Sequence, residues 1–159
     1  METTTLAARA LNPISPSTRG KAFLALLAGL GLTVASTLYI AIDALTTNRL
    51  TNHIRDAYPN WSQDDIDADR LAITIYLLGF GVLGAIAWLW CAWLVQRGKP
   101  SARLAVTVTF IVGTGLAMIN ATQSGEAYEQ IVPTPYGVVG LLPSLAGLAA
   151  VWLIWRRGA

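Results

Sequence analysis

Residues that could carry redox or metal chemistry are scarce in this sequence. It contains one cysteine, Cys91, and one histidine, His53. A single cysteine excludes an internal disulfide and a CxxC redox pair, and a single histidine argues against a haem held by two facing histidines. The chain also has no P-loop and no HExxH zinc motif. We therefore expect no cofactor and no bound metal, and since no nucleophile–base pair can be assembled, we expect that the protein is not an enzyme.

Charged residues are also few. They make up 13% of the 159 residues, whereas about 25% is typical of soluble domains. The net charge of +2 is too small to indicate a nucleic-acid partner. Hydrophobic residues make up 54% of the chain and gather in four long apolar segments, at residues 22–45, 71–95, 104–122 and 136–155.

Each apolar segment is about long enough to cross a bilayer, which needs about 20 apolar residues in a helix. None carries the polar stripe of a soluble amphipathic helix. The sequence therefore predicts an all-α, polytopic membrane protein that contacts the lipid bilayer. Residues 1–20 would form an N-terminal tail and residues 21–157 the transmembrane domain.

Basic residues are distributed unevenly around the segments. Eight of the eleven lie before the first segment, between the second and third, or after the fourth: Arg9, Arg19, Lys21, Arg97, Lys99, Arg103, Arg156 and Arg157. Since basic loops stay inside, both termini are expected in the cytoplasm, which makes the chain a multi-pass, N-in/C-in protein. The first segment is longer than the apolar region of a signal peptide, so we expect it to remain uncleaved.

Residues 46–70 predict a helical hairpin on the outer side. Apolar residues at every fourth position from Leu50 continue the helical pattern of the first segment as far as Pro59, which should end that helix. Ser62, with Asp65 three residues later, is a capping box that would begin the next helix. The aspartates that follow lack the glycine and distal glutamate of an EF-hand, so we interpret them as a solvated helix start rather than a cation site.

Small residues recur at similar depth in the segments. Helices in lipid gain little from apolar burial, so small residues that allow close backbone approach carry their packing. We therefore predict an antiparallel four-helix transmembrane bundle. Its predicted packing residues are Gly29, Gly31, Gly79, Gly81, Gly113, Gly115, Gly140 and Ser144. Pro143 should kink the fourth helix, and a neighbouring helix or water would bind the carbonyl that it frees.

Five tryptophans lie towards the cytoplasmic ends of their segments: Trp88, Trp90, Trp93, Trp152 and Trp155. Anchoring at the membrane–water interface explains them. An aromatic cage for a cationic ligand is the alternative.

Asp43 is the only ionisable residue inside a predicted span. A charge within a membrane is costly and usually marks a functional site, but Asp43 lies two residues from the outer end of its segment. Folding the hairpin back places further polar residues on the same side: Tyr39, Thr74, Tyr76, Asn120 and Tyr136. We favour the interpretation that these side chains bond to water and lipid headgroups. The alternative is a shallow polar pocket that opens outwards.

Three features of residues 59–103 occur together: the turn Pro59-Asn60-Trp61-Ser62, the run Trp88-Leu89-Trp90 with Trp93, and a basic loop that ends Ser101-Ala102-Arg103. This stretch resembles a group of small, uncharacterised four-helix membrane proteins of actinobacteria. Those proteins more often have tryptophan where Ser101 stands. The resemblance implies a location in the bacterial plasma membrane and implies no activity.

Two classes of function follow. The first is a non-enzymatic accessory or scaffolding component of a membrane complex, which would bind another membrane protein or further copies of itself. The alternative is a small-molecule or ion transporter that uses Asp43 in the polar pocket. Small multidrug-resistance transporters also have four spans, but they depend on a glutamate in the first helix, which this chain lacks. Proton-coupled exchange would require Asp43 to face a cavity.

Overall fold

The computed structural model describes residues 15–47, 49–125 and 128–156. Within them the fold is all-helical, and the only β-type pairing is an isolated bridge between Gly125 and Tyr128. The helices are α2 (Pro16–Thr46), α3 (Arg49–Ala57), α4 (Gln63–Gln96), α5 (Ala102–Thr122) and α6 (Thr134–Trp155). Helices α2, α4, α5 and α6 are long and apolar enough to cross a membrane. The prediction of an all-α protein with four candidate spans is confirmed.

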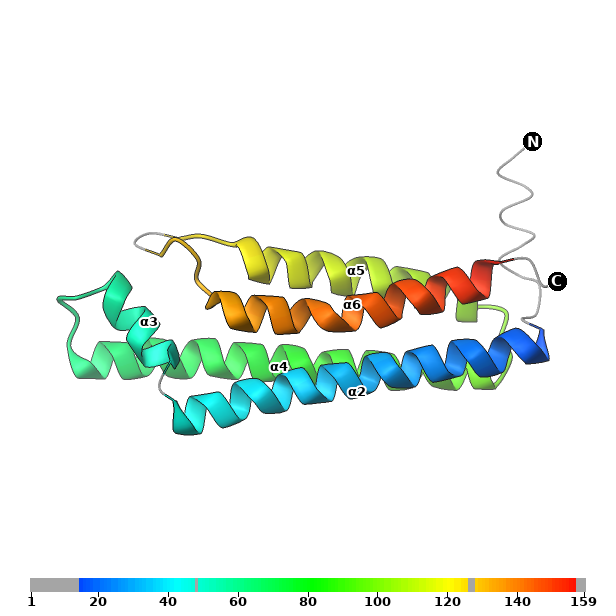
Figure 1. The fold of residues 1–159 in the computed structure, drawn as a ribbon, viewed down its shortest axis with the longest axis horizontal. Helices are drawn as coiled ribbons and strands as arrows, with labels where there is room; N and C mark the ends of the chain where they lie inside the picture. Colours follow the sequence, from blue (N-terminus) through cyan, green and yellow to red (C-terminus); the bar gives the residue numbers. More distant parts are fainter. Residues whose placement is uncertain (1–14, 48, 126–127, 157–159) are drawn as a thin grey trace.

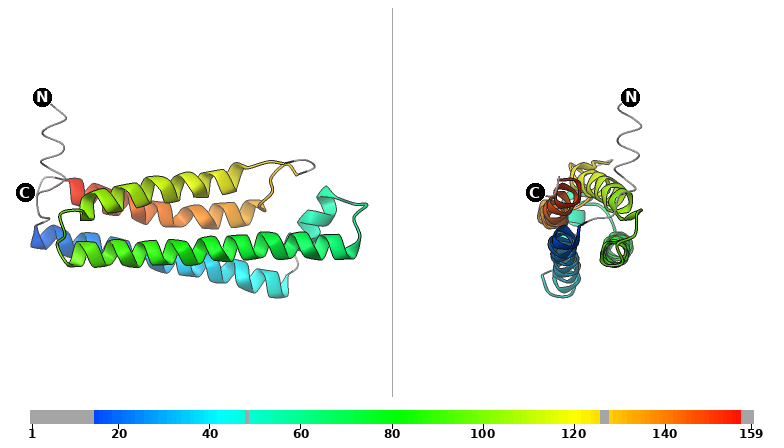
Figure 2. Two further views of the ribbon diagram at one scale, coloured as in Figure 1. Left: turned by 180° about the vertical axis from the view of Figure 1, so that it is seen from behind. Right: turned by 90° about the vertical axis from the view of Figure 1, so that its right-hand side faces the viewer.

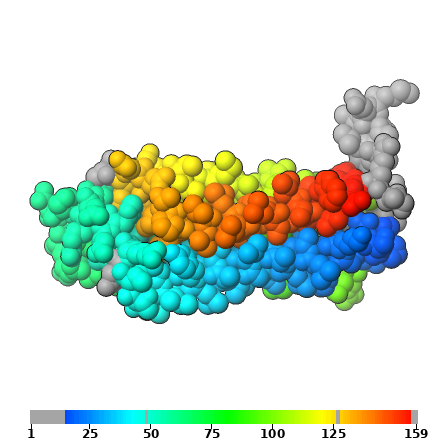
Figure 3. All heavy atoms as spheres, viewed as in Figure 1, coloured from blue at the N-terminus to red at the C-terminus, as the bar shows by residue number. Residues whose placement is uncertain are grey.

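The four long helices lie side by side and give the molecule an elongated shape (Figure 1). Helix α2 packs along both α4 and α6, and α5 packs along α6, whereas α4 and α5 contact each other much less. The end-on view in Figure 2 shows α2 and α6 on one side and α4 and α5 on the other. Figure 3 shows the surfaces of α2 and α6 meeting over most of their length.

Local capping explains where α4 begins and ends. Ser62 Oγ accepts a hydrogen bond from the Asp65 amide at 3.2 Å, and Asp65 Oδ2 accepts one from the Ser62 amide at 3.3 Å. The predicted capping box is therefore confirmed. At the other end Gly98 has a φ of 62°, which glycine adopts without strain. The amides of Gly98 and Lys99 bond to the carbonyls of Val95 and Leu94, which completes a Schellman motif.

The expectation that the first helix continues to Pro59 is wrong. Helix α2 ends at Thr46, and α3 is a separate helix that lies beside the first turns of α4 (Figure 1). Leu50 and Ile54 are the reason, since both are buried, at 2% and 0% exposure. A helix that continued straight along α2 would leave them exposed, whereas the turn lets them pack and gain the free energy of apolar burial.

Buried apolar side chains form two separate cores. One lies at the end where α3 is, hereafter the α3 end, and comprises Ile40, Leu50, Ile54, Ile66, Ile73, Leu77, Val132 and Tyr136. The other lies at the opposite end and comprises Ala22, Leu26, Cys91, Ala92, Leu94, Val95, Ala102, Val106, Ala150 and Ile154. The middle of the molecule, between the two cores, is packed less completely.

Candidate functional site

Asp43 joins three helices at the α3 end. Its side chain, on α2, is only 4% exposed. Tyr136 of α6 donates a hydrogen bond to Asp43 Oδ2 at 2.5 Å, and the Arg49 Nε of α3 lies 3.3 Å from Oδ1. Arg49 also donates to the hydroxyl of Tyr39 at 3.0 Å. The interpretation that Asp43 bonds to water and headgroups therefore fails, because Tyr136 and Arg49 take its two carboxylate oxygens.

The other predicted pocket residues fall into two groups. The Tyr39 ring meets the Tyr136 ring edge-on, with centroids 6.0 Å apart, and so belongs with Asp43. Tyr76 of α4 donates to Asn120 Oδ1 of α5 at 2.7 Å and forms a second, separate pair. Thr74 is half-buried on α4 and belongs to neither group. Sequence reasoning missed Arg49, because the first helix was expected to continue through it to Pro59, where a spacing of six residues does not mark it as a partner of Asp43.

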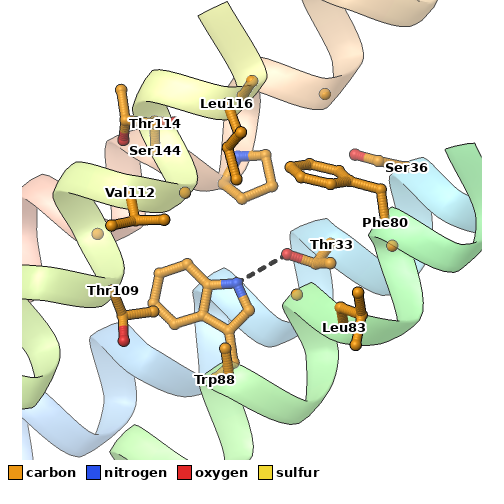
Figure 4. A pocket seen from close by; sticks show the side chains of 18 of the residues that line it. Thr33, Ser36, Phe80, Leu83, Trp88, Thr109, Val112, Thr114, Leu116 and Ser144 are labelled. Carbon is orange, nitrogen blue, oxygen red and sulfur yellow. Dashed lines mark hydrogen bonds between the residues drawn. The ribbon is translucent and has the colours of Figure 1, made fainter. Parts of the chain in front are cut away.

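A cavity that the sequence did not predict lies among the long helices. Its volume is about 450 Å³. Figure 4 shows its walls, to which all four long helices contribute. We call this cavity the slot. Among its lining residues are Thr33 and Ser36 of α2, Phe80 and Leu83 of α4, Thr109, Val112, Thr114 and Leu116 of α5, and Ser144 of α6.

Hydroxyl groups on the α2 wall of the slot bond to the protein itself. Thr33 Oγ1 donates to the Gly29 carbonyl at 2.9 Å, and Thr37 Oγ1 donates to the Thr33 carbonyl at 2.8 Å. Ser36 Oγ shares its hydrogen between the carbonyls of Leu32, at 2.8 Å, and Val139, at 2.9 Å. The slot wall on α2 is therefore apolar in its chemistry although its residues are threonine and serine.

The bond from Ser36 to Val139 has a local cause. Pro143 lies inside α6 and has no N–H, so the carbonyl four residues before it, that of Val139, has no donor within its own helix. Ser36 of α2 supplies one at 2.9 Å. The expectation that a neighbouring helix binds the carbonyl freed by Pro143 is confirmed.

Trp88 packs between helices, contrary to the interpretation of it as an interface anchor. Its Nε1 donates to Thr33 Oγ1 at 2.8 Å (Figure 4). Its ring covers Gly29, where an added Cβ would lie 2.5 Å from the ring. Gly81 is covered in the same way by the side chain of Thr37. At Gly29 and Gly81 the missing side chain is what lets α2 and α4 approach.

Other predicted packing positions have open space beside them. An added Cβ would meet no atom within 4 Å at Gly31, Gly79, Gly113, Gly115 or Gly140. Their depth in the segments matched that of Gly29 and Gly81, but depth does not determine which face of a helix meets a neighbour. Gly113, Gly140 and Ser144 instead line the slot. Further tight contacts lie at Gly137 against Ala121 and at Gly147 against Phe110.

Arginines cover tryptophans at the end opposite α3. Arg97 lies over Trp93 at 5.6 Å and Arg156 over Trp152 at 4.5 Å, measured from the guanidinium carbon to the ring centroid. Trp93 and Trp152 are also well exposed, at 42% and 59%. Each of these cation–π pairs places an arginine of the same chain over one tryptophan ring. Interface anchoring of these two tryptophans stays a prediction.

The α3 end carries a polar contact outside the predicted spans. Tyr128 donates to Asp69 Oδ2 at 2.6 Å and its ring stacks against His53, with centroids 5.4 Å apart. Burial, the hydrogen bond to Asp69 and the charge of Asp69 raise the pKa of the Tyr128 hydroxyl above its ordinary value. In the part of the chain that the structure describes, no three histidine, cysteine or acidic side chains gather as metal ligands would.

Comparison with known proteins gives one partial similarity. No protein-family model and no solved structure matches the chain. The chain is similar to proteins named as probable low-affinity inorganic phosphate transporters, from Mycobacterium bovis and two strains of Mycobacterium tuberculosis. The identity is 32% over 91 residues, which cover 55% of this chain and 21% of each transporter. The chain thus matches about a fifth of the length of these relatives. Together with the four candidate spans, this similarity identifies a membrane protein.

Proposed function

We propose that the protein is a non-enzymatic accessory component of a membrane transport complex. The observation that carries this proposal is the pairing of polar side chains between helices. Asp43 binds Tyr136 and Arg49, and Tyr76 binds Asn120. Each of these groups already has a partner within the chain, so they hold the helices in a fixed arrangement rather than present ligands to a solute. A fixed arrangement is what a subunit needs to support a neighbour.

The transport setting comes from the relatives. Proteins named as inorganic phosphate transporters share 32% identity with the chain over 91 residues. The match covers 21% of the transporter, and the name of these relatives supplies the transport setting of the proposal. Glycines that face open space on different helices, such as Gly31 and Gly79, support the same role, since helices of a partner can approach closely at such positions.

The proposed arrangement is an antiparallel four-helix bundle in the bacterial plasma membrane with both termini in the cytoplasm. Arg19, Arg97, Lys99 and Arg156 lie beside the ends of helices that are remote from α3 (Figure 1). Since basic residues favour the cytoplasmic side, the α3 end would face outwards. Single-cysteine labelling in a Cys91→Ala background tests this orientation, with a cysteine at Asn60 accessible from outside and one at Lys99 protected.

Co-purification tests the accessory role directly. A C-terminally tagged chain, extracted in native lipid discs, should bring down a membrane transport protein in constant stoichiometry. Recovery of this chain alone, or only of further copies of it, would contradict the proposal.

A surface substitution identifies the side that the partner uses. Deleting the hairpin would remove Leu50 and Ile54, which are buried, so a point change is the cleaner test. Trp61 is 38% exposed at the α3 end, and Trp61→Ala should reduce recovery of the partner several-fold. Trp90, which is 59% exposed, provides the matched control, because Trp90→Ala removes an exposed tryptophan far from α3.

Transport by the chain itself is the second candidate, and the similarity to phosphate transporters is the observation that favours it. The purified protein in liposomes would then take up radiolabelled phosphate, and Asp43→Asn would abolish that uptake. Under the accessory proposal the same liposomes show no more uptake than protein-free ones. A flux that depends on Asp43 would replace the accessory proposal with the transporter.

A further inference from the structure

Side-chain contacts between α4 and α5 lie near both ends of the slot. At one end Tyr76 of α4 donates to Asn120 of α5 at 2.7 Å. At the other end Cys91 Sγ of α4 lies 3.4 Å from Thr109 Oγ1 of α5. Between these two contacts residues of all four long helices line the slot, among them Phe80 of α4 and Leu116 of α5 (Figure 4). The slot therefore runs parallel to the helices and has a definite length.

The dimensions of the slot select the kind of occupant. The 15 residues from Leu77 to Cys91, both of which line the slot, extend about 22 Å along α4 at 1.5 Å per residue. Dividing the volume of about 450 Å³ by this length gives a mean cross-section of about 20 Å². A helix with its side chains is about 10 Å across and is too wide for a slot of these dimensions. A single extended hydrocarbon chain fits.

The slot opens sideways, in the direction of the surrounding lipid. Leu83 of α4 and Val112 and Leu116 of α5 line it and are nevertheless 67%, 54% and 41% exposed. Side chains that both line a cavity and remain exposed mark its mouth. Its α2 wall gives no polar ligand, because the hydroxyls of Thr33 and Ser36 are bonded to backbone carbonyls. An apolar chain from the bilayer can therefore enter between α4 and α5 and lie against the α2 wall without leaving a polar group of that wall unpaired.

We propose that the slot binds one acyl chain of a membrane phospholipid, inserted sideways between α4 and α5 with the headgroup outside. One leaflet of the hydrocarbon core is about 15 Å deep, so a chain of that length lies within the slot. An empty slot would lose the dispersion contacts of its walls, whereas the acyl chain restores them. The proposal does not depend on the transport role of the protein.

Native mass spectrometry with paired glycine variants tests this site. The purified full chain is washed in dodecyl maltoside, supplied with dioleoyl phosphatidylglycerol and then diluted. Wild-type protein should retain one phospholipid. Gly113 lines the slot and has no atom within 4 Å of an added Cβ, so Gly113→Leu should fill the slot and reduce the retained lipid at least tenfold. Gly115, on the same helix, has equal space but is not part of the slot, so Gly115→Leu should retain lipid like the wild type.

A second pair keeps the test decisive if Gly113→Leu fails to fold, which circular dichroism will show. Gly140→Leu fills the slot from α6, and Gly31→Leu changes an open position outside it. Loss of the lipid in Gly140→Leu alone supports the site. Three outcomes overturn it. The wild type retains no lipid, or both members of a pair retain the same amount of lipid. In the third, the wild type retains a protein partner instead of lipid, and Gly113→Leu or Gly140→Leu displaces that partner.

Discussion

Helix α4 meets α2 on one side and α5 on the other, and the two contacts differ in kind. Against α2, the large side chain of Trp88 covers Gly29, and Thr37 covers Gly81. Against α5, Gly113 faces the slot and has no atom near it. The comparison teaches that a glycine in a membrane helix brings helices together where a neighbouring side chain fills the space it leaves. Elsewhere the same residue leaves room for lipid or for another chain.

The largest effect is expected from enlarging a glycine on the α2 side. In Gly29→Val the new side chain would collide with the Trp88 ring, because even an added Cβ lies 2.5 Å from it. Overpacking of this kind costs about 2–3 kcal/mol. Gly113→Val makes the same chemical change on the slot side and should leave stability nearly unchanged. Unfolding in mixed micelles with increasing dodecyl sulfate measures both variants, and equal destabilisation would remove the distinction between the two sides.

Removing the Asp43 carboxylate should have the next largest effect. Asp43→Ala leaves the hydroxyl of Tyr136, which is only 2% exposed, without its acceptor. This should lower the free energy of unfolding by about 2 kcal/mol. Arg49 adds little, because it is 53% exposed and regains water. Asp43→Asn keeps an acceptor oxygen and should lose about half as much. Adding Tyr136→Phe to Asp43→Ala should lower the free energy of unfolding little further. If the losses of stability in Asp43→Ala and Tyr136→Phe simply add in the double variant, the hydrogen bond between the two side chains does not stabilise the fold.

A smaller effect is expected where α2 meets α6. Ser36→Ala removes the donor to the Val139 carbonyl and should cost about 1 kcal/mol, the range of hydrogen bonds between membrane helices. Pro143→Ala restores the helical N–H that the carbonyl lacks. In that background Ser36→Ala should therefore cost close to nothing. A double-mutant cycle measures the coupling, and an unchanged cost of Ser36→Ala would show that Pro143 is not the reason for this bond.

The smallest effect is expected at the α3 end, outside the predicted spans. Tyr128 has a raised pKa in the folded chain because of its burial and its bond to Asp69. The folded state thus holds this proton more tightly than the unfolded state, whose pKa is about 10. The stability that this provides is complete below pH 10 and falls as the pH rises above it. Wild-type protein should lose stability as the pH rises above about 10, and Tyr128→Phe should lose less. The same loss in both would exclude Tyr128 as the cause.

Several local features followed from residue type alone. The start of α4 depends on neighbours in the sequence, so the pair Ser62 and Asp65 was enough to predict it. Pro143 likewise predicted a carbonyl in need of an outside donor. The polar pocket was predicted less well. Tyr39, Asp43 and Tyr136 do meet, whereas Tyr76 pairs with Asn120. Arg49 was missed, because the change of direction between α2 and α3 brings it to Asp43.

An all-helical chain with four segments able to cross a membrane was predictable from the amino-acid sequence, because apolar length is a property of each segment alone. Tertiary structure decided which face of each helix meets a neighbour. Gly29 and Gly31 look equivalent in the sequence, yet Gly29 lies beneath Trp88 and Gly31 faces open space. The slot is a further consequence that no segment encodes alone, since residues of all four long helices line it. Helices that are apolar all round carry no sequence pattern that fixes their rotation, so packing fixes it.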